Sequence, residues 1–116
     1  KARLFEDQYI CSGGQFYELM VGHDRFNADL RPLLDKRLEK EGKALGICCH
    51  PYDVCTVLIA KEMGIVVEKP NGKPIDAPLD TTSPVAWVGY GNTQLKEAIA
   101  PVLKEVLDEQ GLSVED

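Results

Sequence analysis

The sequence predicts an α/β protein, a layered sandwich in which a small mixed sheet is covered by helices. Two stretches lead to this prediction. Residues 85–90 (VAWVGY) are dominated by β-branched and aromatic side chains, which favour a strand. Residues 95–107 place their apolar side chains three or four positions apart, which is typical of an amphipathic helix. Along the whole chain the expected order is helix, strand, helix, helix, strand, strand, helix.

The first part of the chain is expected to supply a helix and a strand before a charged helix. Ser12 can cap the first helix, and His23 is expected in the turn that ends it. Pro32 then interrupts the pattern after a stretch in which polar and apolar residues alternate, as in a strand. The expected elements are a strand within residues 1–11, a helix over 15–21, a strand over 24–30 and a charged helix over 33–42.

The stretch at residues 46–64 is expected to deliver polar groups to the start of a helix. Pro51 suits a first helical turn, where its missing N–H would have no partner in any case. Asp53 falls inside that turn, where free backbone N–H groups and the helix dipole favour a carboxylate. Apolar residues continue at helical spacing until Gly64, a typical helix end. Helix starts of this kind bind anions and metals.

Turn and capping residues bound the remaining elements. Asn92 is a good N-cap for the final helix, and Gly111 should end it. Pro101 lies inside the helical pattern, so a kink or a break is expected there. The other expected features are a strand at 65–68, an Asn71-Gly72 turn, a buried Trp87 and Tyr90, and a disordered tail at 112–116.

The composition fits one globular domain over residues 1–116. The chain has 44% hydrophobic and 28% charged residues, which are ordinary values for such a domain. The net charge of −6 argues against nucleic-acid binding, which depends on neutralising phosphates, and against anionic membrane surfaces. No apolar run approaches the ~20 residues that a membrane span needs. The chain begins with Lys1 rather than Met, which predicts a trimmed chain or a fragment.

The four cysteines are expected to be reduced thiols of a cytoplasmic protein. Cys48 and Cys49 are adjacent, so they cannot easily bridge each other, and Cys55 lies in the predicted helix. A disulfide between Cys11 and one of the others is an alternative. With His50 these cysteines could bind zinc, although structural zinc sites use paired ligands such as C-x₂-C, repeated twice. A thiol at a helix start could also act as a nucleophile, but no third group is identifiable.

Asp53 has two possible roles on spacing alone. It can be a metal ligand, or it can be an ordinary carboxylate of a first helical turn, which stabilises a helix by about 0.3–1 kcal/mol. Its surroundings are similar to W-D-x-A-A/G-x-x-I/L-x-x-E-A-G-G, the second signature of the inositol monophosphatase family. The matching positions are Tyr52-Asp53, Leu58-Ile59, Glu62-Met63-Gly64-Ile65, the turn at 71–75, Tyr90-Gly91-Asn92 and the segment at 12–24.

This resemblance covers nearly the whole chain and implies a function. The family contains magnesium-dependent, lithium-sensitive phosphomonoesterases with a layered αβαβα fold, and this chain would correspond to the C-terminal α/β half. Asp53 would match the aspartate that completes the metal site, so it would bind Mg²⁺ and lie close to the substrate phosphate. Ser12 and Asp29 would contact the substrate, an inositol or sugar phosphate. No residue of this chain is assigned a catalytic role.

The chain also departs from the family pattern. The family's other metal carboxylates come from an upstream Glu and from a D-P-[IL]-D-G-[ST] motif, and the sequence has neither. Tyr52 replaces the usual Trp, and residues 31–45 look like an insertion. One Asp cannot hold the pair of magnesium ions that phosphoryl transfer uses, so little phosphatase activity is expected of the chain alone. The alternatives are a free-standing binding or oligomerisation module without catalysis, and an unrelated α/β module.

A homo-oligomer, most simply a dimer, is also expected. If the N-terminal half of the family fold is missing, a sheet face or edge that it would cover is exposed. Exposed strand edges and apolar patches tend to be paired in native proteins.

Overall fold

The computed structural model describes Leu4 and residues 10–113, so most of the predicted strand within 1–11 lies outside the described residues. The element order agrees with the prediction for the rest of the chain. In sequence the elements are α1 (Ser12–Met20), β1 (Phe26–Asp29), a 3₁₀ helix (Arg31–Leu34), α2 (Asp35–Lys40), a second 3₁₀ helix (Pro51–Val54), α3 (Val57–Glu62), β2 (Val66–Glu68), β3 (Trp87–Tyr90) and α4 (Thr93–Glu109).

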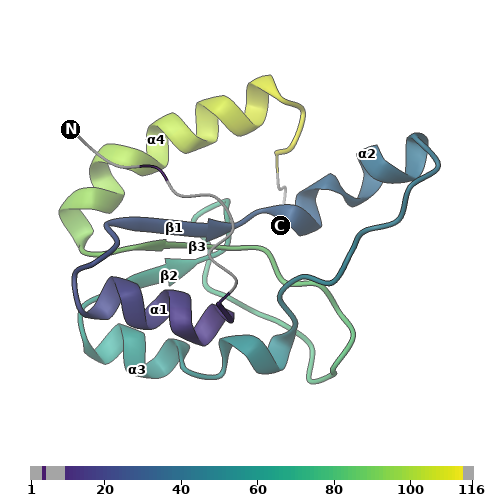
Figure 1. Ribbon diagram of the computed structural model, residues 1–116. Coiled ribbons are helices and arrows are strands. Elements are labelled where there is room, and N and C mark those ends of the chain that lie inside the picture. The colour runs from purple at the N-terminus through teal and green to yellow at the C-terminus, as the bar shows by residue number, and fades with distance from the viewer. Residues whose placement is uncertain (1–3, 5–9, 114–116) are drawn as a thin grey trace.

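The three strands form one sheet in the order β1-β3-β2 (Figure 1). Both pairs are antiparallel, with Tyr90 opposite Phe26 on one side and opposite Val66 on the other. The prediction of a mixed sheet is therefore wrong for the described strands. A parallel pair needs a crossover connection, usually a helix, whereas β2 and β3 are joined by a loop without one.

Helices cover both faces of the sheet. Figure 1 shows α1 and α3 side by side on one face and α4 on the other. Alternation along β3 sends Trp87 toward α1, where its ring meets Phe16 edge to face with centroids 4.8 Å apart. Tyr90 points to the opposite face and lies 5.5 Å from the ring of Phe26. Both residues are buried, which confirms their predicted place in the core.

The predicted helix ends are largely confirmed. The Asn92 side chain accepts a hydrogen bond of 2.8 Å from the backbone N–H of Leu95. Gly64 and Gly111 have φ values of 83° and 69°, the left-handed conformation that glycine adopts most easily after a helix. Pro101 neither splits α4 nor ends it, because the helix continues on both sides of it to Glu109. Pro101 is exposed, so the carbonyl that loses its intrahelical donor can be hydrated.

One other local prediction needs correction. Ser12 does not cap α1, because Cys11 is the capping residue and its sulfur accepts from the N–H of Gly14 at 3.4 Å. In the tail predicted to be disordered, the N–H of Leu112 donates to the carbonyl of Leu107 at 2.8 Å, and residues 114–116 lie outside the described residues.

The predicted charged helix is confirmed as the 3₁₀ helix at Arg31–Leu34 and α2 after it. Figure 1 shows α2 projecting from the body of the domain. None of the helices in the described part of the chain is long and apolar enough to cross a lipid bilayer.

A substitution at Gly89 can test how closely β3 approaches α1. A Cβ atom at this position would lie 2.6 Å from Cδ1 of the buried Leu19 and 3.2 Å from Cζ3 of Trp87. We expect Gly89→Ala to lower the free energy of unfolding by about 1–3 kcal/mol, as overpacking does in other cores. Urea unfolding measures this, with Gly46→Ala as the control because a Cβ there meets nothing within 4 Å. Equal stability of the two variants would contradict the packing described.

Candidate functional site

A pocket of about 830 Å³ lies where the start of α1, the end of β1 and the segment before α3 meet. It brings together Ser12, Asp29 and Asp53, the three residues predicted to form a site. They are separated by up to 41 positions in the sequence, so only the fold makes them neighbours of one space. Gln15 and Asn27 also line this pocket, as do the cysteines and histidine of the 46–50 segment.

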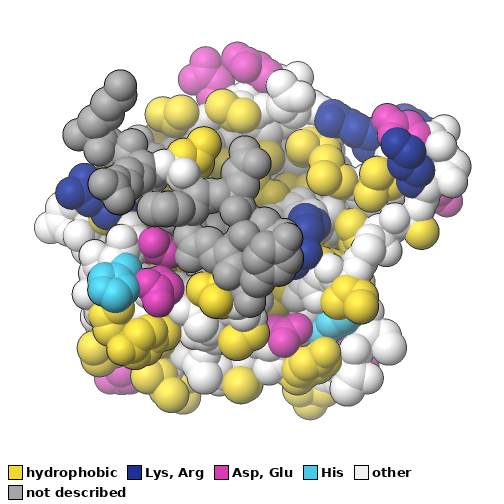
Figure 2. Space-filling view, viewed as in Figure 1, with side chains coloured by type: hydrophobic (Ala, Val, Ile, Leu, Met, Phe, Trp, Pro, Cys, Tyr) yellow, Lys and Arg dark blue, Asp and Glu magenta, His cyan; other side chains and the backbone are white. Residues whose placement is uncertain are grey.

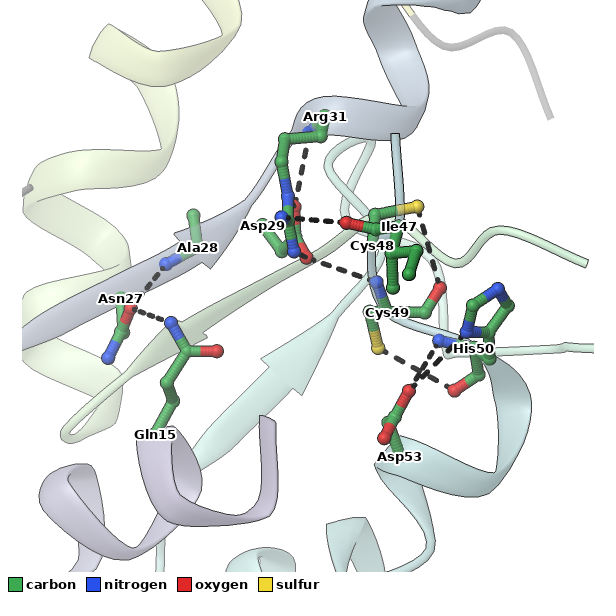
Figure 3. Close-up of polar contacts among 10 residues, drawn as sticks. All are labelled: Gln15, Asn27, Ala28, Asp29, Arg31, Ile47, Cys48, Cys49, His50 and Asp53. Carbon is green, nitrogen blue, oxygen red and sulfur yellow. Dashed lines mark hydrogen bonds and ion pairs between the residues drawn. The ribbon is translucent and has the colours of Figure 1, made fainter. Parts of the chain in front are cut away.

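The Asp29 carboxylate accepts four hydrogen bonds, three from Arg31 and one from Cys49 (Figure 3). The Arg31 guanidinium donates to both carboxylate oxygens, from Nε at 2.9 Å and from its terminal nitrogen at 2.7 Å. The backbone N–H of Cys49 donates to Oδ2 at 3.3 Å. The same Arg31 also donates to the carbonyl of Ile47 at 3.0 Å. Asp29 therefore fastens the 47–49 segment to the end of β1.

These contacts lower the pKa of Asp29. Burial alone would raise it, because a buried carboxylate loses its hydration. The hydrogen bonds and positive charge of Arg31, with the N–H of Cys49, outweigh that effect and hold the pKa below its ordinary value. Asp29 therefore stays ionised at neutral pH, with both oxygens already engaged. Its geometry suits a positioning role better than the predicted contact with substrate.

Asp53 lies across the pocket, inside a first helical turn as predicted. That turn is the 3₁₀ helix from Pro51 to Val54, and α3 begins only at Val57, so the single long helix expected from Pro51 is two short ones. The backbone N–H of His50 donates to Oδ2 of Asp53 at 2.8 Å, and the His50 Nδ1 lies 3.8 Å from the same oxygen. Within the described residues, Oδ1 of Asp53 receives no hydrogen bond.

His50 and Tyr52 form the outer wall near Asp53. Their rings are stacked, with centroids 5.7 Å apart and planes 11° apart. The His50 Nδ1 is buried and lies 3.8 Å from Oδ2 of Asp53. His23, in contrast, lies in the predicted turn after α1 and pairs with Glu18 at 2.7 Å, away from this pocket.

The two buried cysteines, Cys48 and Cys49, contribute packing rather than reactivity. Burial raises the pKa of the Cys49 thiol to about 11, and a hydrogen bond with the Ser12 side chain offsets this only in part. The pKa of Cys48 is raised as well, first by burial and then by the Asp29 charge. Because the thiolate is the nucleophile and the metal ligand, these protonated thiols do not support either role at neutral pH. Cys11, Cys48, Cys49 and Cys55 are all free thiols.

Sequence reasoning missed several residues of the pocket. The side-chain amide of Gln15 donates to Oδ1 of Asn27 at 3.3 Å, and Asn27 in turn donates to Asp24 at 3.1 Å. Alternation along β1 could have identified Asn27, since it lies on the same face as Asp29. No sequence signal pointed to Arg31, because its role depends on where the 47–49 segment returns.

The donor set fits a magnesium ion poorly. Mg²⁺ is bound by carboxylates and other hard oxygen ligands, yet the carboxylate of Asp29 is already engaged by Arg31. In the described part of the chain no group of three or more His, Cys, Asp or Glu residues could hold a metal ion. Among the described residues that line this pocket, only Asp53 has a carboxylate oxygen that accepts no hydrogen bond.

Comparison with known proteins adds no relative: no protein-family model, no curated protein and no solved structure matches the chain.

Asp29 makes acid stability a test of the pocket. We expect Asp29→Asn to lower the free energy of unfolding at pH 7 by about 1–3 kcal/mol, because a buried hydrogen-bonded charge is lost. The pKa is lowered in the native state, so this stabilisation is present above the unfolded value of about 3.9 and is lost as the pH falls through the native pKa. The difference between the two proteins should thus shrink toward pH 2. Urea unfolding against pH measures it, and a pH-independent difference would contradict the ion pair.

Thiol reactivity tests the cysteine assignment. Cys11 and Cys55 are exposed, whereas Cys48 and Cys49 are buried. With a thiol reagent such as dithionitrobenzoate, we expect the first pair to react in the native protein and the second pair only after unfolding. The double variant Cys11→Ser, Cys55→Ser is the control. Rapid modification of that variant under native conditions would show that Cys48 or Cys49 is accessible and reactive.

Proposed function

We propose that this chain is part of a magnesium-dependent phosphomonoesterase of the inositol monophosphatase type, which acts on inositol or sugar phosphates. One observation carries the proposal. Ser12, Asp29 and Asp53, which the sequence resemblance selects, line one pocket although they come from α1, β1 and the turn before α3. The antiparallel three-stranded sheet between helices is compatible with such a fragment but is not specific to it.

The proposed roles of the three residues follow from their contacts. If a magnesium ion binds here, Asp53 would hold it through Oδ1, because Oδ2 already accepts from the N–H of His50. The ion would supply positive charge to neutralise a substrate phosphate. Asp29 acts through Arg31 and the Cys49 backbone, which it holds at the wall of the pocket. Ser12 is buried against Cys49, so it shapes the floor rather than reaching far into solvent.

The amides of Gln15 and Asn27 are suited to the hydroxyl groups of a sugar or inositol ring. An amide both donates and accepts hydrogen bonds, as a hydroxyl does. Both residues line the pocket and are partly exposed, and their mutual bond of 3.3 Å is long enough to be exchanged for a ligand. These two residues are the polar contacts that we add to the three predicted from sequence.

We further propose that the chain alone has little or no phosphatase activity and works in the cytoplasm. Two-metal phosphoryl transfer needs several carboxylates as metal ligands, whereas Asp53 is the single carboxylate that we assign as a ligand. The four free thiols support a reducing compartment. The charge of −6 is unfavourable for nucleic-acid partners. The second candidate, a non-catalytic binding module, is favoured because no group of three or more potential metal ligands is found among the described residues.

Ligand titration tests the proposal. In calorimetry with inositol 1-phosphate and Mg²⁺ together, we expect weak binding by the wild type and a loss of about tenfold or more in Asp53→Asn. Without Mg²⁺ the Asp53 charge opposes a phosphate, so little binding is expected. Asp76→Asn is the matched control, because Asp76 is exposed, lies outside this pocket and forms no ion pair with the residues that the structure describes.

The possible results separate the two candidates. Magnesium-dependent binding that Asp53→Asn removes, without turnover, supports the phosphatase-related role. Binding of inositol phosphate that needs neither Mg²⁺ nor Asp53 supports the non-catalytic module. If the wild type binds neither Mg²⁺ nor the phosphate up to about 10 mM, a range typical of the weakest specific ligands, the proposed site is refuted.

A further inference from the structure

The outer surface formed by α1, α3 and the residue that follows each helix carries five exposed large apolar side chains. They are Tyr17, Val21, Leu58, Ile59 and Met63, here called the α1/α3 patch, and between 45% and 67% of each is exposed. Figure 1 shows the two helices side by side on one face of the sheet, and Figure 2 shows apolar side chains gathered over them at the lower left. The patch is separate from the pocket that holds Asp53.

The sequence of α3 is unusual for a solvated helix. Its inner side is formed by Val57 and the fully buried Ala60, which pack against the core. Its exposed side carries Leu58 and Ile59 beside the charged residues Lys61 and Glu62. Large apolar side chains gathered on the exposed side of a helix are typical of a surface that another element or partner covers. The outer side of α3 therefore lacks a covering element in the structure of the described residues.

The patch is large enough for a modest protein interface. Five such side chains at these exposures present roughly 500 Å² of apolar surface, which is toward the upper end of what a monomer leaves uncovered. Two copies of the patch facing each other would bury about 1,000 Å², and a polar rim adds to this, which reaches the lower bound of specific interfaces.

The charges beside the patch point to a second copy of the chain as the partner. Lys61 and Glu62 are adjacent on the exposed side of α3, and neither forms an ion pair within the described residues. A surface that carries one charge of each sign next to an apolar stripe is complementary to itself. Under two-fold symmetry, Lys61 of one copy would face Glu62 of the other, and the reverse contact would follow automatically.

We propose that the α1/α3 patch is the interface of a two-fold symmetric homodimer. The apolar side chains of Leu58, Ile59 and Met63 form its centre, and Lys61 and Glu62 form reciprocal ion pairs at its rim. The sheet edges and α4 stay outside this interface. The dimer thus joins helical layers, whereas the sequence predicts association through an exposed sheet face or edge.

Sedimentation velocity of the full 116-residue chain over about 1–200 µM tests the proposal. We expect a concentration-dependent dimer. Ile59→Lys combined with Met63→Lys should raise its dissociation constant about tenfold or more, because two charges would be buried without partners. The matched control is Val102→Lys combined with Val106→Lys, which adds the same charges to the exposed apolar residues of α4. Circular dichroism of every variant verifies the fold, since all four side chains are exposed.

A charge exchange tests the ion pairs separately. Lys61→Glu should weaken the dimer, and Lys61→Glu combined with Glu62→Lys should restore it, because the pairing is then reversed in both copies. A wild type that stays monomeric at the highest concentration overturns the proposal. So does a dimer that survives the patch variant, or one that the α4 control dissociates. Failure of the double exchange to restore association refutes the reciprocal ion pairs and with them the two-fold arrangement.

Discussion

The burial of β3 on both faces and along both edges is the constraint on which the rest of the fold depends. All four of its residues are buried, and it pairs with β1 on one side and β2 on the other. Its alternating side chains meet α1 through Trp87 and face the α4 side through Tyr90. Gly89 allows Leu19 to approach the strand within a distance that a Cβ atom would not permit. Because both faces of this strand are buried, helices cover the sheet on both sides, with α1 and α3 on one face and α4 on the other (Figure 1).

Asp29 holds the wall of the pocket together. It is the last residue of β1, and its carboxylate ties together Arg31 and the backbone of Cys49. Both oxygens of the Asp29 carboxylate accept hydrogen bonds, so this side chain supports the wall of the pocket but is not available to bind a ligand. Asp53, on the opposite wall, keeps one oxygen without a hydrogen bond from the described residues. A pocket with one rigid and one available carboxylate is suited to binding more than to two-metal catalysis.

The domain presents two separate surfaces that could meet other molecules. The pocket is polar and lies at the ends of β1 and α1, whereas the α1/α3 patch is apolar and lies on the outer helical layer. Their separation means that association of two copies through the patch would leave the pocket open. Buried, protonated Cys48 and Cys49 stabilise the wall of the pocket by packing, so the most conspicuous residues of the 46–64 stretch are not its reactive groups.

The sequence by itself determined the features that depend on local chemistry. Helical spacing, strand alternation, the Asn92 cap and the glycines after the helices predicted the element order, because each arises from residues a few positions apart. Asp53 in a first helical turn was likewise a local inference. The resemblance selected Ser12 and Asp29 as well, and all three residues line one pocket.

Only the tertiary structure decided what depends on distant residues. The antiparallel sheet replaced the expected mixed one, since pairing is set by how the loop between β2 and β3 returns. Cys11 caps α1 in place of the predicted Ser12, because Ser12 is buried against Cys49. The Asp29 carboxylate is held in place because Arg31 and the Cys49 backbone converge on it. Local patterns determine which elements form, but burial and charge pairing across the fold determine which side chains are left available to bind.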